Sequence, residues 1–164
     1  MRRATKVVGA AERGGRPIND TVILNYEQRS ARTTTVDGLK SGCYEIALDQ
    51  PVRLRTDDTL LLDDGSLIEV VAAPEPLVEA RASDLAGLAR LAWHLGDRHI
   101  PIQMLPNRIR ARCDPAVEEL LKTLGAKVTM LEAPFEPEGG AYDSHTHAHS
   151  HGHTHSHDHH HHRD

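Results

Sequence analysis

Residues 77–131 decide the fold of the C-terminal half, and they read LVEARASDLAGLARLAWHLGDRHIPIQMLPNRIRARCDPAVEELLKTLGAKVTML. The stretch opens with a predicted strand over residues 77–82, and helical spacing of the apolar residues follows. Ser83 is the predicted N-cap of this helix, and Gly96 is its predicted end. The apolar face of the helix is predicted to consist of Leu85, Leu88, Ala89, Ala92 and Leu95.

A second helix follows with clear signals at both ends. Asp114 and Pro115 stand in the favoured order of N-cap and first-turn proline, and Gly125 is the predicted end. Residues 100–105, 108–112 and 127–131 are predicted strands. The apolar stripe of the second helix is Val117, Leu120, Leu121 and Leu124. The order strand, helix, strand, strand, helix, strand is that of a split βαβ, or ferredoxin-like, domain.

The N-terminal half contains short β-forming runs and no convincing amphipathic helix. Residues 33–36 lead into an Asp-Gly turn, and residues 43–48 and 52–55 alternate as half-buried strands do. Residues 60–62 and 67–71 flank the turn sequence DDGS, which predicts a β-hairpin. These closely spaced strands predict a small sandwich or barrel-like domain.

The predicted fold class is α+β, with a small all-β N-terminal domain, a ferredoxin-like βαββαβ domain and a disordered His-rich tail. Pro74 and Pro76 predict a linker, because two prolines so close together disfavour regular strand pairing. The predicted boundaries are 1–74, 75–137 and 138–164. The last region offers no apolar residues with which to build a core, so we expect it to be disordered without a ligand.

Composition excludes several classes of protein. The formal net charge of -5 over 164 residues argues against a general nucleic-acid binder, which needs a basic face. We see no secretory signal, and no apolar run approaches the length of a membrane helix. The two cysteines, Cys43 and Cys113, are too few and too far apart for a disulfide framework. We therefore expect a cytoplasmic protein with free thiols, and we expect Cys113 to be a buried structural residue.

The last twenty residues predict metal binding. Histidines alternate with other residues and then run together, at His145, His147, His149, His151, His153, His155, His157, His159, His160, His161 and His162. Imidazole is a good ligand for nickel, copper and zinc, and alternate residues of an extended chain point the same way. The interleaved pattern differs from a purification tag, which is a plain run of histidine. A storage or buffering tail remains an alternative to a delivery role.

Only two further histidines exist, His94 and His99. We expect His94 to face solvent, about half a turn from the apolar stripe of its helix. His99 follows the predicted helix end, and such loop positions commonly carry function. One histidine per chain makes a weak site, but a two-fold axis would bring two copies of His99 to one ion. From these residues alone, an ordinary surface histidine remains open for His99.

The enzyme class fits poorly. A catalytic metal site needs three protein ligands and an open position, and the sequence has no HExxH motif. We therefore predict a protein that is not an enzyme. A general folding chaperone, whose β domain would bind unfolded segments by strand addition, is a third alternative.

The sequence HLGDRHIPIQ at residues 94–103 resembles the signature of the urease accessory protein E family. The resemblance spans nearly the whole chain, including the β-rich half, the βαββαβ half and the His-rich tail. It implies a nickel metallochaperone of urease maturation, with Ni(II) as cargo. Because imidazole also binds Zn(II) and Cu(II), we expect these ions to bind in vitro as well. It implies a homodimer in which His99 is the nickel ligand at the dimer interface.

The same resemblance implies the partners. They are the urease accessory GTPase, protein G, and the urease apoprotein complex. Net charge and the lack of a long apolar run already argue against nucleic acid and membrane as partners. Some members carry further histidines in the next strand-to-helix region, where this chain has Arg112, Cys113, Asp114 and Pro115. A second metal site in the folded part is therefore not expected.

Overall fold

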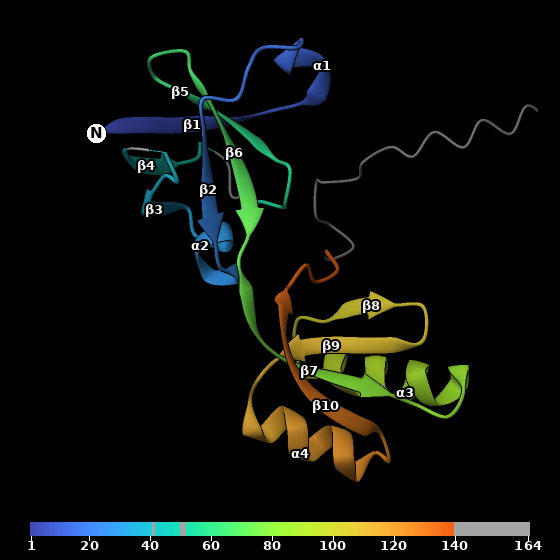
Figure 1. The fold of residues 1–164 in the computed structure, drawn as a ribbon. Coiled ribbons are helices and arrows are strands. Elements are labelled where there is room, and N and C mark those ends of the chain that lie inside the picture. The colour runs from blue at the N-terminus through green and yellow to red at the C-terminus, as the bar shows by residue number, and fades with distance from the viewer. Residues whose placement is uncertain (41, 50–51, 140–164) are drawn as a thin grey trace, which may run out of the picture.

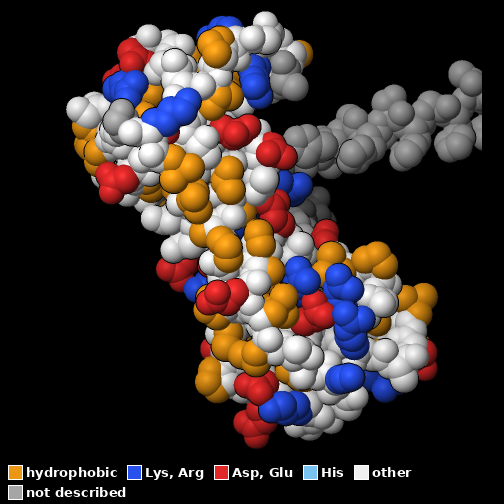
Figure 2. Space-filling model, in the orientation of Figure 1, with side chains coloured by type: hydrophobic (Ala, Val, Ile, Leu, Met, Phe, Trp, Pro, Cys, Tyr) orange, Lys and Arg blue, Asp and Glu red, His pale blue; other side chains and the backbone are white. Residues whose placement is uncertain are grey.

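Backbone pairing divides the strands of this computed structural model between two sheets, which form the two lobes seen in Figures 1 and 2. The structure describes residues 1–40, 42–49 and 52–139. The strands are β1 (Arg2–Val8), β2 (Asp20–Leu24), β3 (Thr33–Asp37), β4 (Cys43–Ala47), β5 (Thr59–Leu62), β6 (Leu67–Ala72), β7 (Pro74–Arg81), β8 (Gln103–Leu105), β9 (Arg108–Arg112) and β10 (Lys127–Pro134). The helices are α1 (Ala10–Arg13), α2 (Tyr26–Ser30), α3 (Leu85–Asp97) and α4 (Pro115–Thr123). The fold is therefore mixed α and β, with strands predominating.

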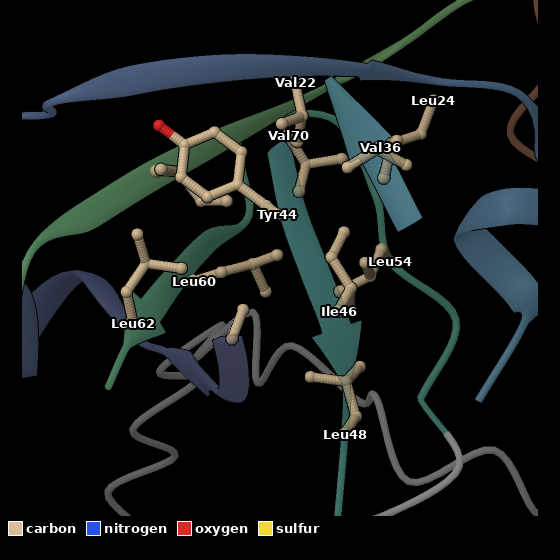
Figure 3. Packing of buried hydrophobic residues seen from close by; sticks show 12 residues of the cluster. Val22, Leu24, Val36, Tyr44, Ile46, Leu48, Leu54, Leu60, Leu62 and Val70 are labelled. Carbon is tan, nitrogen blue, oxygen red and sulfur yellow. The ribbon is translucent and has the colours of Figure 1, made fainter. Parts of the chain in front are cut away.

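The N-terminal sheet is barrel-like. Its six strands have the order β2-β6-β5-β1-β4-β3, with β1–β4 and β2–β6 parallel and the other pairs antiparallel. The two edge strands approach each other through an isolated bridge between Val22 and Gly38. The Leu39 amide also donates to the Thr21 carbonyl at 2.9 Å. Inward-facing aliphatic residues and Tyr44 fill the interior, as Figure 3 shows.

Close packing at Gly38 allows this closure. A Cβ atom at Gly38 would lie 2.2 Å from Asp20 Oδ2 and 2.7 Å from Tyr44 Cε2, so glycine alone fits. The Tyr44 hydroxyl donates to the same Asp20 oxygen at 2.9 Å. Burial and this hydrogen bond raise the pKa of Tyr44.

Some N-terminal predictions are confirmed and others are wrong. Strands β5 and β6 form the predicted hairpin, and Gly65 in its turn has a φ of 82°. Residues 52–55 were expected to form a strand, but they are irregular. The short helix α2 was not expected either, although Asn25 and Gln28 form a capping box at its start. Five residues are too few to show a helical period.

The C-terminal elements follow the predicted order of strand, helix, strand, strand, helix, strand. Their antiparallel sheet has the order β10-β7-β9-β8, and Figure 1 shows both helices on one side of it. The core between sheet and helices consists of Val78, Ala80, Leu88, Leu91, Leu95, Ile109, Ala111, Val117 and Leu121. Asp114 caps α4 with Pro115 in the first turn, as predicted.

Several boundaries differ from the prediction. Residues 73–76 are no linker, because β7 begins at Pro74 and pairs with β10 along its whole length. The prolines are tolerated there because β9 pairs with β7 only from Leu77 onward. Asp84, not Ser83, is the N-cap of α3, since its side chain accepts from the Gly87 amide.

The apolar face of α3 is also rotated from the one predicted. Leu91 is buried, whereas Leu85 and Ala89 are exposed. The helix continues through Gly96 to Asp97. The predicted strand over 100–105 shortens to β8, at Gln103–Leu105.

Arg29 of α2 joins the two lobes. Its guanidinium is 1% exposed and donates to the carbonyls of Leu24, Leu54 and Phe135. Carboxylates of Glu75 and Glu136 lie 3.8 and 3.7 Å away. The single charge thus ties both sheets and the segment after β10 together.

No helix among the described residues is long and apolar enough to cross a membrane.

Candidate metal site

His99 lies at the C-terminal end of α3, where three backbone hydrogen bonds terminate the helix. The Arg98 amide donates to the Leu95 carbonyl at 3.2 Å, and the His99 amide donates to the Gly96 carbonyl at 2.9 Å. The Ile100 amide then reaches back to the Leu95 carbonyl at 3.0 Å. The last two bonds form a Schellman motif, in which His99 occupies the position after the C-cap.

That position normally belongs to glycine, because the chain there enters the left-handed region. His99 has a φ of 55°. Helix α4 ends in the same motif, with Gly125 at the equivalent position and a φ of 81°. Its bonds, from Gly125 to Lys122 and from Ala126 to Leu121, measure 2.9 and 3.0 Å. The chain therefore uses glycine at one helix end and a strained histidine at the other.

Backbone strain of this kind concentrates at functional positions. A non-glycine residue in the left-handed region costs roughly 1–2 kcal/mol. His99 is exposed, so burial of its side chain does not offset this cost. Asp57 also has a positive φ, of 70°, but of the two only His99 carries an imidazole, so we treat His99 as the leading candidate ligand of the described residues.

A hollow of about 340 Å³ adjoins His99. It is also lined by Cys113 and Asp114, which connect β9 to α4. Cys113 is a free, exposed thiol, so the expectation that it is buried is wrong. The β9 strand ends at Arg112, and residues 112–116 are exposed. The Asp114 carboxylate already accepts from the amides of Ala116 and Val117, at 2.8 and 3.3 Å.

Within the described ranges, no group of three His, Cys, Asp or Glu side chains is arranged to hold a metal ion. His94, which was expected to face solvent, is half-buried, and its ring meets Trp93 edge-on with centroids 5.0 Å apart. The predicted ligands from His145 to His162 lie outside the described residues, as does the predicted disorder of the tail. The described residues of one chain therefore do not supply three metal ligands at His99.

Two features of this half were not predicted from the sequence. The outer side of α3 carries exposed Leu85 and Trp93, at 78% and 65% exposure. Three arginines also converge on Glu79 across β7 and β9. The alternation of Arg108, Arg110 and Arg112 is visible in the sequence. Only the fold shows that Arg108 and Arg110 share Glu79 of the neighbouring strand, whereas Arg112 pairs with Glu27 of α2.

Comparison with known proteins identifies the family. Residues 75–162 match the family model described as UreE urease accessory protein, C-terminal domain. A urease accessory protein UreE of Rhodopseudomonas palustris (strain BisB18) is 47% identical over 142 residues, covering 87% of this chain and 67% of the relative. The UreE of Chelativorans sp. (strain BNC1) is 42% identical over 146 residues, covering 89% of this chain and 90% of the relative.

These similarities place the protein among accessory proteins and not among enzymes, as the sequence predicted. The chain belongs to the UreE family of urease accessory proteins. The family resemblance inferred from HLGDRHIPIQ is thereby confirmed.

Proposed function

We propose that the protein is a nickel metallochaperone that takes part in urease maturation, binding Ni(II) through histidine and delivering it to the urease assembly complex. One observation carries the proposal. An exposed histidine is held in a strained left-handed conformation at a helix end, in a chain that belongs to the UreE family. The names of its relatives, urease accessory proteins, support the urease role. Nothing in these similarities favours zinc or copper as the cargo.

The nickel site is proposed to form between two copies of the chain. Leu85, Ala89 and Trp93 are exposed and four residues apart, so they form an apolar stripe on the outer side of α3. Such a stripe favours packing against a partner. A two-fold axis that runs parallel to α3 beside this stripe would bring the His99 of both copies together, because His99 ends the same helix.

The tail is proposed to supply the remaining ligands and to gather further ions. These are the histidines at 145, 147, 149, 151, 153, 155, 157 and 159–162. Tethering raises their concentration near the His99 site, and individual rings can leave the metal one at a time during handover. Acid should release the metal, because imidazole must be neutral to bind it.

The proposed partners are the GTP-binding urease accessory protein and the urease apoprotein complex. We also propose action in the cytoplasm, which suits the two exposed free thiols, Cys43 and Cys113.

The domain layout is proposed as residues 1–74, 75–137 and 138–164. The separate hydrophobic cores of the two sheets support the first boundary.

A storage or buffering protein is the rival function. It is favoured by the count of histidines, of which 13 occur in the chain and only His94 and His99 precede the tail. A storage role needs the tail alone, whereas a chaperone with a defined transfer site also needs His99.

Nickel titration by calorimetry separates these functions. The samples are the full chain, the chain truncated after Tyr142, and the truncated chain with His99→Ala. The truncated chain with His94→Ala is the matched control, because His94 lies in the last turn of the same helix. Light scattering gives the mass of each sample in solution.

We expect the truncated chain to be a dimer that binds one nickel ion. His99→Ala should abolish this binding, and His94→Ala should preserve it. Absence of binding in the truncated dimer would assign the metal wholly to the tail and favour storage.

A further inference from the structure

Among the described residues, α3 and α4 cover one face of the C-terminal sheet, and the other face meets a helix only at the end of β9, where Arg112 contacts Tyr26 and Glu27 of α2. Val78, Ala80, Ile109 and Ala111 point into the core beneath α3 and α4. Side chains alternate along strands, so the intervening residues occupy the opposite, open face. Its basic members are Arg81 on β7, Arg108, Arg110 and Arg112 on β9, and Lys127 on β10. Figure 2 shows Lys and Arg side chains gathered around an acidic one over this lobe.

Glu79 organises three of these arginines. Its Oε1 accepts from Arg81 at 3.0 Å, and its Oε2 accepts from Arg110 Nε at 2.9 Å. The Nε atom of Arg108 lies 3.1 Å from the same Oε2 but is buried without a hydrogen bond. Burial would raise the pKa of Glu79, but the hydrogen bonds from Arg110 and Arg81 lower it overall. The carboxylate is therefore an anion held between three cations.

The charges on this surface do not balance. One carboxylate faces three guanidinium groups, which repel one another. Nearby acids are engaged elsewhere, because Glu136 pairs with Arg29 and the Glu138 side chain accepts from the Met104 amide. The whole chain has a formal net charge of -5, so the positive surplus is local.

The arginines are also fixed in position. The side chains of Arg108 and Arg110 are 30% and 18% exposed, so their stems are largely covered while part of each remains accessible. The carboxylate of Glu79 orients the guanidinium groups of Arg81 and Arg110 by hydrogen bonds, and that of Arg108 donates to Asn107 Oδ1 at 3.3 Å. A planar guanidinium held in this way is preorganised for carboxylate oxygens, which it can bind through two parallel hydrogen bonds.

We propose that the surface formed by Arg81, Arg108, Arg110 and Glu79 is a docking site for an acidic segment of a partner protein. Charge complementarity selects this occupant. Single-stranded nucleic acid would favour aromatic stacking platforms, and the open-face positions Gln103, Leu105, Thr129 and Leu131 supply no aromatic ring. The Tyr26 ring at the end of this face is already in contact with Arg112, whose guanidinium lies 5.5 Å from the ring centroid. The inference goes beyond metal delivery and does not require nickel as the cargo.

The test uses fluorescence anisotropy to measure binding of a fluorescein-labelled peptide to the full chain. The peptide has about ten glutamates, because an extended peptide of that length, at about 3.3 Å per residue, spans the sheet. The buffer is at pH 8 with chelator, so that the tail histidines are neutral and free of metal. Arg108→Gln and Arg110→Gln probe the surface. The matched control is Arg16→Gln, because Arg16 is exposed in the other lobe, where its side chain donates to the Arg13 carbonyl. A labelled thymidine oligonucleotide is titrated in parallel.

We expect each surface variant to weaken peptide binding by roughly ten-fold, the effect of losing a hydrogen bond to a charged group. Binding should also weaken with added salt, and Arg16→Gln should change it less than about two-fold, because surface charges far from the site are screened. Circular dichroism identifies any variant that fails to fold. If one of the two arginine variants is unfolded, the other one tests the proposal. Equal weakening by Arg16→Gln, absence of peptide binding, or tighter binding of the oligonucleotide would each overturn the proposal.

Discussion

Replacing His99 by glycine should stabilise the protein while destroying its proposed metal site. The φ of 55° places His99 in a region that costs a side chain bearing Cβ roughly 1–2 kcal/mol. Glycine removes that cost but loses more entropy on folding, roughly 0.5–1 kcal/mol. We therefore expect His99→Gly to raise the free energy of unfolding by about 0.5–1 kcal/mol. His99→Ala keeps the Cβ and should change it by less than about 0.5 kcal/mol.

Urea unfolding followed by circular dichroism measures this difference. Chelator and a constant protein concentration are needed, because bound metal and dimerisation both stabilise the folded state. With a slope of about 1–3 kcal/mol/M, the His99→Gly midpoint should rise by roughly 0.2–1 M. Gly125→Ala makes the opposite change, adding a Cβ atom at the equivalent position of α4, and should lower the midpoint. No atom lies within 4 Å of its added Cβ, so only backbone strain should lower the midpoint.

Equal midpoints for His99→Gly and His99→Ala would refute the reasoning, since the Cβ would then carry no strain. Stabilisation by both variants would refute it as well, because the imidazole itself would be the source. The expected result leaves glycine as the more stable residue at a position where the chain has histidine. Stability alone would then not explain the presence of histidine.

Three further predictions concern stability. Gly38→Ala should lower the free energy of unfolding by about 2 kcal/mol through overpacking against Asp20, whereas Gly9→Ala, which adds its Cβ to open space, should be nearly neutral in the same urea assay. Arg29→Met should cost about 3 kcal/mol, because it leaves two carboxylates and three carbonyls without their cation, and an equal loss in exposed Arg32→Met would contradict this. The pKa of Glu79 is lower in the folded protein than its unfolded value near 4.5. Ionised Glu79 therefore stabilises the fold at pH values above 4.5, and this contribution should be lost as the pH falls through the folded pKa. In Glu79→Gln, the free energy of unfolding should therefore fall less steeply as the pH is lowered. An unchanged pH dependence would show that Glu79 makes no such contribution.

Local signals explain the successful predictions. Asp114 and Pro115 start α4 because the N-cap oxygen and the fixed proline φ act within one turn. The β5–β6 hairpin is likewise encoded by its short turn, where Gly65 accepts a positive φ. The signature at residues 94–103 indicated the family from contiguous residues alone. Each of these features depends on residues that are neighbours in sequence.

Other features required the folded chain. The prolines of β7 indicated a linker, but pairing with β10 on one edge made a strand possible. Leu91, not Leu85, became buried, because the sheet decides which side of α3 it covers. The sequence also assigned the stop of α3 to Gly96, whereas the helix continues to its C-cap at Arg98.

The sequence by itself determined the order of the C-terminal elements, the hairpin, the caps of α4, the family and the histidines available for metal. Only the tertiary structure decided that His99 lies in a left-handed conformation and that three arginines share Glu79. Periodicity and capping act over a few residues, so a single sequence reveals them. The arginine surface joins strands far apart in sequence through an ion pair between Arg110 and Glu79, and its geometry exists only once the sheet has formed.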